Sequence, residues 1–367
     1  MLILGIETSC DETGVAIVEG RTNSEKVKLL SNVVASSLPL HAKSGGIIPE
    51  NAAREQIKLI IPVINEAIEQ CNNLAIGDID AIAVTYGPGL IGSLLVGVET
   101  AKTLSFVWNK PLIPVNHLIG HVYANFIDFE LNPNVEFPAI GLIVSGGHTD
   151  LVLMKGHGSI KWLGGTRDDA AGEALDKIGR LLGLPYPGGP YIEKMANDGN
   201  LNKYKFPSPL IDSNDFDLSF SGLKTAVFRE VQNLNYSSSG ASAKSRSKFS
   251  TGSNNKNLNQ QTIADISASV QKAIIDVLVK KTLKAAEQYN AKSILLGGGV
   301  AANNSLRENF KFRISNFELR AKLFVPTKSL CTDNAAMIAA AAFFNNQEVS
   351  WRNLDANPNL YFNSLNY

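Results

Sequence analysis

The feature that most constrains the fold is a pattern that occurs once in each half of the sequence: two short apolar strands joined by a small polar loop. Leu2–Ile6 and Val15–Val18 are the expected strands of the first pair, and Ala139–Val144 and Leu151–Met154 are those of the second. Both intervening loops are rich in Ser, Thr or Gly, so each pair is predicted to form a β-hairpin. A repeated hairpin of this kind predicts two similar lobes that face a shared cleft.

Strands alternate with helices along the rest of the chain. Apolar residues recur at helical spacing over Pro49–Asn72, with Pro62 inside the pattern as a candidate kink or break. A strand at Ala81–Thr85 precedes a helix at Gly92–Trp108. The same order recurs at Leu112–Val115 with the helix after it, and at Ser293–Leu296 with a helix from about Asn304. This alternation predicts a layered α/β fold.

The composition is that of a globular protein without a strongly charged surface. Of the 367 residues, 44% are hydrophobic, and 34 acidic residues balance 34 basic ones. The length accommodates two domains. A protein that grips nucleic acid over its whole surface is usually more basic, so any such contact must be local or shared with a partner. Cys10, Cys71 and Cys331 are too few for a disulfide framework or a thiolate cluster.

No stretch of the sequence is long and apolar enough to predict a membrane-spanning helix. The longest apolar run, Ala335–Phe344, is rich in Ala and predicts a packed helix. The first expected strand begins at Leu2, so we expect no signal or transit peptide. We therefore expect a soluble, cytoplasmic protein without membrane contact.

The segment Asn235–Gln261 differs from the rest in composition. It is rich in Ser, Asn and Gly, and it contains Lys244, Arg246, Lys248 and Lys256 but no acid. Such a segment cannot bury enough apolar surface to offset the entropy lost on ordering. We expect an inserted surface loop whose charges could help to hold a polyanion, although a plain solvated insertion is the simpler explanation.

The strongest chemical signal is a pair of histidines, His117 and His121, four residues apart. At this spacing both imidazoles lie on one helical face and can reach one metal ion; the alternative is two unrelated helix histidines. Leu118 stands where a zinc protease of this pattern has its catalytic Glu, which argues against that class. With one carboxylate added, the set suits Fe(II), with Zn, Mn or Mg as alternatives. Asp333 is the candidate acid, although its place directly before the Ala-rich helix equally predicts a helix cap.

Two glycine-rich loops could approach a nucleotide. Ser145-Gly146-Gly147-His148-Thr149 joins two strands, and its glycines would let backbone N–H groups reach an anion. Gly297-Gly298-Gly299 falls between a strand and a helix, where small residues would let a phosphate or a flat ring lie against the backbone. Neither loop is a Walker A or GxGxxG motif, and each alone could be an ordinary turn. Together they favour a nucleotide in the cleft.

Three further motifs are open to more than one interpretation. Residues 167–177 place several carboxylates on one helix, either as a solvated face with pairs such as Glu173–Lys177 or with one acid binding ribose hydroxyls. Tyr186–Pro190 is a rigid turn that could line the same pocket. Asp217–Thr225 combines hydroxyls, aromatic rings and a cation, and its composition alone predicts no role.

These motifs coincide with a known family. From end to end, apart from residues 235–261, the chain resembles the catalytic subunits of the tRNA threonylcarbamoyladenosine transferases, formerly described as O-sialoglycoprotein endopeptidases. The matching runs are Gly5–Thr13, Gly45–Glu50, Gly87–Leu90, Val144–Thr149, Asp168–Asp176, Tyr186–Pro190, Ser219–Thr225 and Cys331–Asn334.

The resemblance implies the two-lobed α/β fold of actin, Hsp70 and sugar kinases, with duplicated mixed-sheet domains and a central cleft. We expect the first lobe at residues 1–116, completed by a C-terminal helix at about 334–345. The second lobe is expected at 117–333, with the insertion at about 235–261.

The resemblance also implies site residues. The metal ligands would be His117, His121 and Asp333. Relatives often have other residues at Asn116, Ile119, Gly297 and Ala301, and we expect none of these differences to abolish binding. The threonylcarbamoyl-adenylate would be held by Ile143, Val144, Ser145, Gly146, Gly147, Asp176, Gly189 and Asn303.

The implied reaction is transfer of a threonylcarbamoyl group from threonylcarbamoyl-AMP to N6 of adenine 37 in tRNAs that read codons beginning with A, forming t6A. The implied partners are tRNA, an inactive paralogue and a P-loop ATPase subunit. Two other functions remain open at this point: a small-molecule kinase of the same fold, and a chaperone-like ATPase, which has no natural need for the histidine pair.

Overall fold

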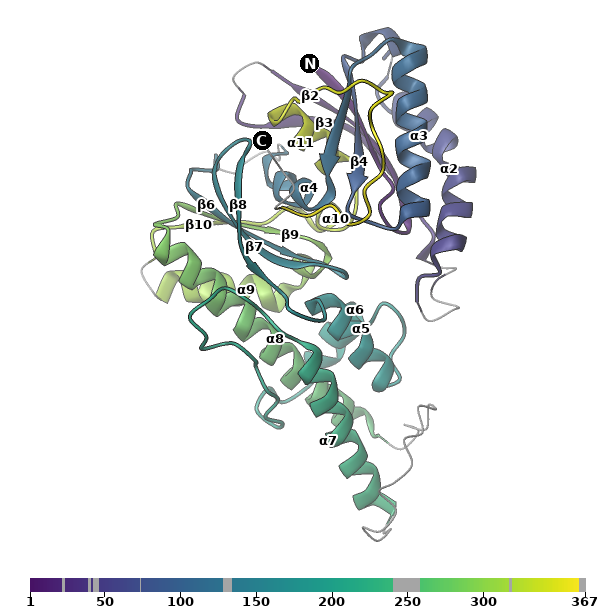
Figure 1. Cartoon of the computed structure of the whole chain (residues 1–367). Helices are drawn as coiled ribbons and strands as arrows, with labels where there is room; N and C mark the ends of the chain where they lie inside the picture. Colours follow the sequence, from purple (N-terminus) through teal and green to yellow (C-terminus); the bar gives the residue numbers. More distant parts are fainter. Residues whose placement is uncertain are drawn as a thin grey trace.

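The computed structural model of this chain describes residues 1–21, 24–38, 41, 46–72, 74–127, 134–239, 258–316 and 319–362. Two five-stranded mixed sheets form its framework, and they lie side by side with helices on and between them (Figure 1). The hairpins predicted from the sequence begin each sheet.

The first sheet has the strand order β3-β2-β1-β4-β5. Strands β1, β2 and β3 are antiparallel neighbours, whereas β4 and β5 run parallel to β1. The strands are β1 (Leu2–Glu7), β2 (Glu12–Gly20), β3 (Val27–Ser36), β4 (Ala81–Gly87) and β5 (Leu112–Asn116).

The second sheet repeats the first strand for strand. Its order, β8-β7-β6-β9-β10, has the same sequence of antiparallel and parallel pairs. The strands are β6 (Ala139–Val144), β7 (Thr149–Gly156), β8 (Ser159–Gly165), β9 (Ser293–Gly297) and β10 (Lys322–Phe324). The duplication expected from the two hairpins therefore extends to whole sheets.

Helices cover the outer faces of both sheets. On the first sheet these are α2 (Pro49–Glu69) and α3 (Ile91–Trp108). On the second, α8 (Gln260–Gln288) packs against β6 and β9, with α9 (Asn304–Asn316) beside it. Helix α2 continues through Pro62, whose ring is exposed. The freed backbone carbonyl of an exposed turn can bond water, so the expected break is absent.

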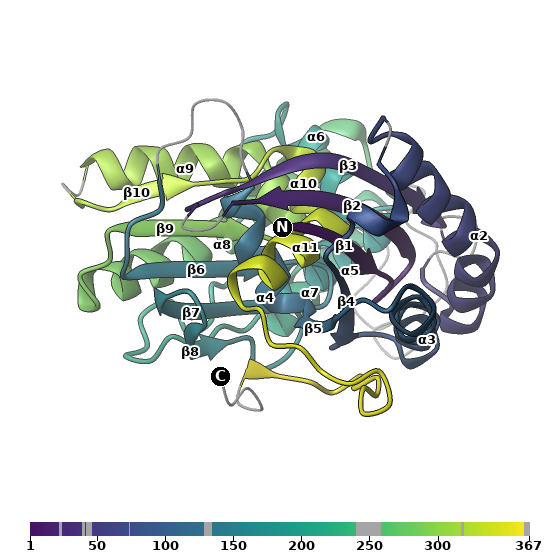
Figure 2. The same ribbon diagram turned by 90° about the horizontal axis from the view of Figure 1, so that it is seen from above.

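Two helices fill the space between the sheets (Figure 2). Helix α4 (His117–Tyr123) follows the last strand of the first sheet but packs against β6 and β9 of the second. Helix α11 (Ala335–Phe344) follows the second sheet but packs against β1 and β2 of the first. The two helices also contact each other, so each half of the chain contributes one helix to the inner face of the other sheet.

This arrangement explains why the strands are apolar on both faces. Ile3 faces the layer that contains α4 and α11, whereas its neighbour Leu4 faces α2 and α3. In the second sheet, Ile143 faces the same middle layer and Leu142 faces α8. Alternate residues of one strand thus enter two different cores. The lobe boundaries expected at residues 116 and 333 stay a prediction.

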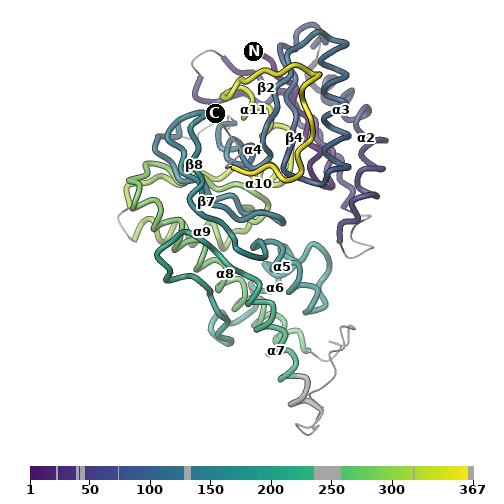
Figure 3. Tube along the Cα trace, viewed as in Figure 1, coloured from purple at the N-terminus to yellow at the C-terminus, as the bar shows by residue number. Residues whose placement is uncertain are grey.

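Helices α5 (Ala171–Leu181), α6 (Gly188–Ala196) and α7 (Ser221–Ser239) share the core of the second sheet that contains α8. The short α10 (Lys328–Cys331) contacts residues 299–302, and its Leu330 reaches the core between the sheets. Helix α7 extends away from both sheets (Figure 3). It includes residues 235–239, and α8 begins at Gln260, so the predicted loop 235–261 was too long at both ends. Residues 240–257 of that prediction lie outside the described residues.

The segment after α11 connects the two sheets. Val349 N–H donates to the Leu112 carbonyl (2.9 Å), and Asn357 N–H donates to that of Tyr86 (2.7 Å). Further along, the Tyr361 hydroxyl donates to the buried Asp150 of β7. None of the helices in the described part of the chain is both long and apolar enough to span a membrane.

Candidate metal centre and substrate cleft

A side-chain cap fixes the start of the helix that carries the histidine pair. Asn116 ends β5, and its side-chain oxygen accepts hydrogen bonds from the N–H groups of Leu118 (2.8 Å) and Ile119 (3.3 Å). This is the geometry of an N-cap residue. Every residue of α4 is buried, including His117 and His121. The Asn116 cap and the burial of α4 therefore fix the position of this short helix, and with it the positions of both imidazole rings.

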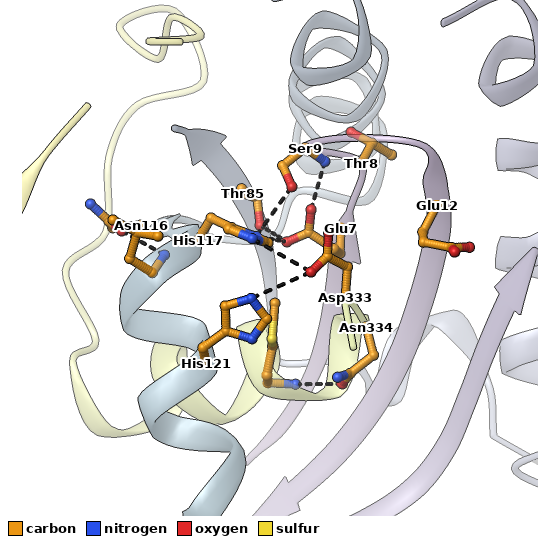
Figure 4. Close-up of polar contacts among 12 residues, drawn as sticks. Glu7, Thr8, Ser9, Glu12, Thr85, Asn116, His117, His121, Asp333 and Asn334 are labelled. Carbon is orange, nitrogen blue, oxygen red and sulfur yellow. Dashed lines mark hydrogen bonds and ion pairs between the residues drawn. The ribbon is translucent and has the colours of Figure 1, made fainter. Parts of the chain in front are cut away.

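The two histidines and Asp333 converge on one point (Figure 4). Oδ1 of Asp333 lies 3.3 Å from Nε2 of His121 and 3.6 Å from Nε2 of His117. One donor atom from each residue lies within 4.8 Å of the others, and no other group of this kind occurs among the described residues. Three donors at such distances can coordinate one ion, as the helical spacing of the histidines predicted.

Asp333 does not cap the helix that follows it. The cap of α11 is Asn334, whose side-chain oxygen accepts from the Met337 N–H (3.1 Å). The alternative role for Asp333 considered from the sequence is therefore wrong, because the next residue performs it. The carboxylate of Asp333 is left to face the histidines, and its side chain is 23% exposed, so the centre opens on this side.

The charges at this centre depend on one another. Burial alone would raise the pKa of Asp333, but the positive charge of His117 and the close contact with His121 hold that pKa well below its usual range. Burial would lower the pKa of His117, but Glu7 and Asp333 raise it to about 9. Burial lowers the pKa of His121.

His121 provides the clearest test of whether these residues fit a metal ion. Neither of its ring nitrogens has a well-aligned hydrogen bond with any described residue, although the side chain is completely buried. Buried polar atoms are normally satisfied. A divalent cation bound between Nε2 and the Asp333 carboxylate would satisfy one of them, so the donor set fits a metal ion.

Glu7 belongs to this centre, although no spacing pattern in the sequence selects it. Its carboxylate is completely buried and lies 3.0 Å from Nδ1 of His117 (Figure 4). Thr85 and Ser9 also hydrogen-bond to it. No spacing signal links Glu7 to His117, because the contact exists only when β1 and α4 are brought together. Its place in a run that matches the family was the only available indication.

The two glycine-rich loops meet at the ends of neighbouring strands. Ile143 of β6 pairs with Gly297 of β9 in parallel register, so the residues that follow both strands emerge at the same edge. Gly298 has a positive φ of 92° and packs so closely that a Cβ there would lie 2.4 Å from the Val144 carbonyl oxygen. Only glycine fits this position.

The loop between β6 and β7 has open space where a ligand could approach. A Cβ added to Gly146 or Gly147 would meet no atom within 4 Å among the described residues. Ser145 N–H donates to the His148 carbonyl (2.8 Å), which closes the turn and leaves the glycine backbone at its tip. Ile143, Val144, Ser145, Gly146 and Gly147 therefore form a continuous edge beside the triple-glycine turn.

The other expected substrate residues lie in hydrogen-bonded caps. Asp176 of α5 accepts from the Gly188 N–H (2.7 Å) at the start of α6, next to Gly189. Asn303 caps α9 by accepting from the Leu306 N–H (2.9 Å), and its amide donates to Gln271 (2.8 Å). The expected pair between Glu173 and Lys177 is present at 2.9 Å. These bonds hold the Asp176 and Asn303 side chains in fixed positions.

The glycine loops and the metal ligands are connected through one short segment. Residues Gly299–Ala302 form a 3₁₀ turn that contacts α5, β6 and α10. Helix α10 ends at Cys331, two residues before Asp333. His148 of the first glycine loop is close enough to the metal ligands to be affected by their charges. Burial lowers its pKa to about 4, with smaller contributions from His117 and His121.

Comparison with known proteins identifies the family. The model of the family described as tRNA N6-adenosine threonylcarbamoyltransferase matches residues 28–340. The chain belongs to this family. A threonylcarbamoyltransferase of Moorella thermoacetica is 46% identical over 364 residues, which cover 98% of this chain and 97% of that protein. One from Thermosipho africanus is 47% identical over 362 residues, covering 98% and 99%.

A solved structure supports the fold class of this threonylcarbamoyltransferase family member. HypF from T. kodakarensis superposes with a TM-score of 0.58 over 94% of this chain and 47% of HypF, at 15% sequence identity. At this identity the likeness concerns the fold alone, and it confirms the two-lobed α/β class. The family match favours a transferase over the small-molecule kinase and the chaperone-like ATPase.

Proposed function

We propose that this chain transfers the threonylcarbamoyl group of threonylcarbamoyl-AMP to N6 of adenine 37 in tRNAs that read codons beginning with A. The observation that carries the proposal is near-complete alignment, over 98% of the chain, with enzymes named for transfer to adenosine N6 of tRNA. The position in the tRNA and the acyl donor follow from the family resemblance of the motifs around the cleft.

His117, His121 and Asp333 are proposed to hold one divalent metal, with Fe(II) the first choice and Zn, Mn or Mg as alternatives. Such an ion would supply Lewis-acid polarisation of the carbamoyl carbonyl or of the phosphate. The unsatisfied nitrogens of His121 and the partial exposure of Asp333 support this assignment.

The glycine loops are proposed to hold the adenylate. N–H groups at Gly146 and Gly147 would donate to the phosphate as negative charge develops on it during release of AMP. Ile143, Val144 and Ser145 would line the edge beside them, and Asp176, Gly189 and Asn303 would hold the nucleoside end. The exocyclic amine of adenine is a weak nucleophile. The enzyme would therefore accelerate the transfer mainly by holding this amine against the carbamoyl carbon.

We also propose that the enzyme works in the cytoplasm with protein partners, namely an inactive paralogue and a P-loop ATPase. The balanced charge of the chain supports a shared tRNA-binding surface. Exposed aliphatic side chains on the adjoining helices α2 and α3 support a protein contact there. They are Ile57, Ile61, Ile91 and Leu95.

The direct test is analysis of tRNA nucleosides by mass spectrometry after incubation with metal-loaded enzyme, threonylcarbamoyl-AMP and the candidate partners. We expect t6A to form, and to be lost when His117→Ala replaces the wild type. A metal-loaded wild-type enzyme that leaves the adenosine unmodified would refute the proposed activity. Full transfer by His117→Ala would instead refute the metal role.

A further inference from the structure

Glu7 is a buried carboxylate in contact with a metal-site histidine. Oε1 accepts from the Ser9 N–H (2.6 Å), whereas Oε2 accepts from the Thr85 hydroxyl (2.6 Å) and lies 3.0 Å from Nδ1 of His117. A buried carboxylate is unfavourable unless it is paired and hydrogen-bonded. Both oxygens of Glu7 meet this condition, so the side chain is held in one orientation with its charge directed at His117.

This contact determines which nitrogen of His117 can bind a metal. A carboxylate is only an acceptor, and Oε2 at 3.0 Å is closer to Nδ1 than the Ser9 hydroxyl at 3.2 Å, so Nδ1 carries a proton and donates it to Oε2. Nε2 is then the atom that faces Asp333, at 3.6 Å from Oδ1. Acceptors at the second ring nitrogen commonly fix the tautomer and the orientation of metal-binding histidines.

The loop that carries Glu7 is itself fixed. The buried Gln56 of α2 donates to the carbonyls of Cys10 (3.2 Å) and Glu12 (2.8 Å), just after Glu7 in the first hairpin. His121, by contrast, has no equivalent acceptor at Nδ1 among the described residues. His117 is therefore the anchored ligand of the pair.

We propose that Glu7 is a positioning residue of the metal site, which holds the His117 ring so that Nε2 is free to bind a divalent cation. The inference rests on the proposed metal role of His117, His121 and Asp333.

The substitution Glu7→Gln tests this geometry because the surrounding donors decide how the amide must lie. The Ser9 N–H cannot become an acceptor, so it requires the amide oxygen at the Oε1 position. The NH₂ group then faces His117 in place of the acceptor, and only the longer contact with the Ser9 hydroxyl (3.2 Å) remains to hold the Nδ1 proton. The favoured arrangement has Nδ1 accepting from the amide and the proton on Nε2. The atom that should bind the metal would be blocked, although the side chain keeps its size.

The experiment is titration of the purified full-length protein with Co²⁺ against a chromophoric chelator, without tRNA or adenylate. We expect Glu7→Gln to bind Co²⁺ about 10–100-fold more weakly than the wild type. The matched control is Glu12→Gln, the same change in the same hairpin at a residue that does not touch His117, and it should keep the wild-type affinity. Equal affinity of Glu7→Gln and the wild type would overturn the proposal.

A second measurement needs no variant and covers the case in which Glu7→Gln does not fold. In ¹⁵N-labelled, Zn²⁺-loaded wild type, imidazole spectra should show a proton on Nδ1 of His117 and none on Nε2. A proton-free Nδ1 would overturn the proposal. If the wild type binds neither Co²⁺ nor Zn²⁺, this inference and the metal role fail together, whereas loss of t6A formation with intact metal binding refutes only the proposed activity.

Discussion

His121 and Asp333 lie 3.3 Å apart, Nε2 to Oδ1, although they come from opposite halves of the chain. His121 lies on α4, which follows the last strand of the first sheet. Asp333 lies after the last strand of the second sheet, between the short α10 and α11. Helices α4 and α11 pack against each other between the sheets (Figure 2). The candidate metal centre is therefore located where the two repeats meet, and it requires both to be folded.

Asp333→Asn should remove metal binding. The amide keeps the size of the side chain but is neutral and a weak ligand, so the affinity for Co²⁺ should fall by more than the roughly 10–100-fold typical of an outer-shell change. Calorimetric titration measures this. Asp355→Asn, an exposed acid elsewhere, is the control and should bind normally. Normal binding by Asp333→Asn would show that the carboxylate is not a ligand.

Glu12 should make the protein less stable as pH rises through neutrality. Burial raises its pKa from 4.5 to about 7, although Ser36 hydrogen-bonds to it, and its Oε2 has no partner among the described residues. The folded protein thus holds this proton more tightly than the unfolded chain. The resulting stabilisation is complete below the unfolded pKa and is lost as pH rises through about 7.

The measurement is urea unfolding of Glu12→Gln and the wild type, without metal, on both sides of this range. The free energy of unfolding of Glu12→Gln relative to the wild type should rise by about 2 kcal/mol from low to high pH. This figure allows for the partial exposure of Glu12. A difference that does not change with pH would contradict the assignment of this titration to Glu12.

Gly297→Ala should disturb α4. A Cβ at Gly297 would lie 2.4 Å from the carbonyl oxygen of His121, so the strand or the helix must shift. Overpacking of this kind costs about 1–3 kcal/mol, and the displaced His121 should bind metal more weakly. Gly299→Ala is the matched control for stability, because the nearest atom to its Cβ is Thr332 Cγ2 at 4.0 Å. Similar unfolding midpoints for the two variants would argue against close packing at Gly297.

Asp168→Ala should loosen the start of α7. The Asp168 carboxylate accepts from the hydroxyl of Ser219 (2.6 Å), the N–H of Phe220 (2.7 Å), and the N–H and hydroxyl of Ser221 (3.1 and 2.8 Å). Loss of these bonds should lower the free energy of unfolding by about 1–2 kcal/mol. Asp212→Ala, which removes an exposed pair with Lys280, should leave the free energy of unfolding almost unchanged. Equal losses would mean that Asp168 is not an anchor.

Local patterns predicted the hairpins, the helices α2, α3, α4, α9 and α11 and the histidine pair, because these depend on residues close together in the sequence. They did not predict the long helix α8 or the strands β3, β8 and β10. Strand β3 is an edge strand with mixed polarity, and β10 has three residues. Both are defined by pairing with a neighbouring strand, which is a contact between distant parts of the chain.

For the candidate site too, the sequence predicts local relationships but not contacts between distant residues. Helical spacing brought His117 and His121 together, but an acid before a helix is equally suited to capping and to binding a metal. The structure decides against the capping role of Asp333, because Asn334 is the cap of α11. No local pattern selects Glu7, since its contacts with Thr85 and His117 follow no sequence period.

Because α4 and α11 each pack on the sheet of the other half of the chain, the two halves cannot be separated into independent proteins. A protein ending at Asn116 would keep the first sheet but lack α11, so the apolar inner faces of β1 and β2 would be left in water. A single repeat of this design would be stable only as a pair of molecules that exchange their last helices. In the present chain that exchange takes place within one molecule, so the covalent link between the repeats replaces a concentration-dependent association.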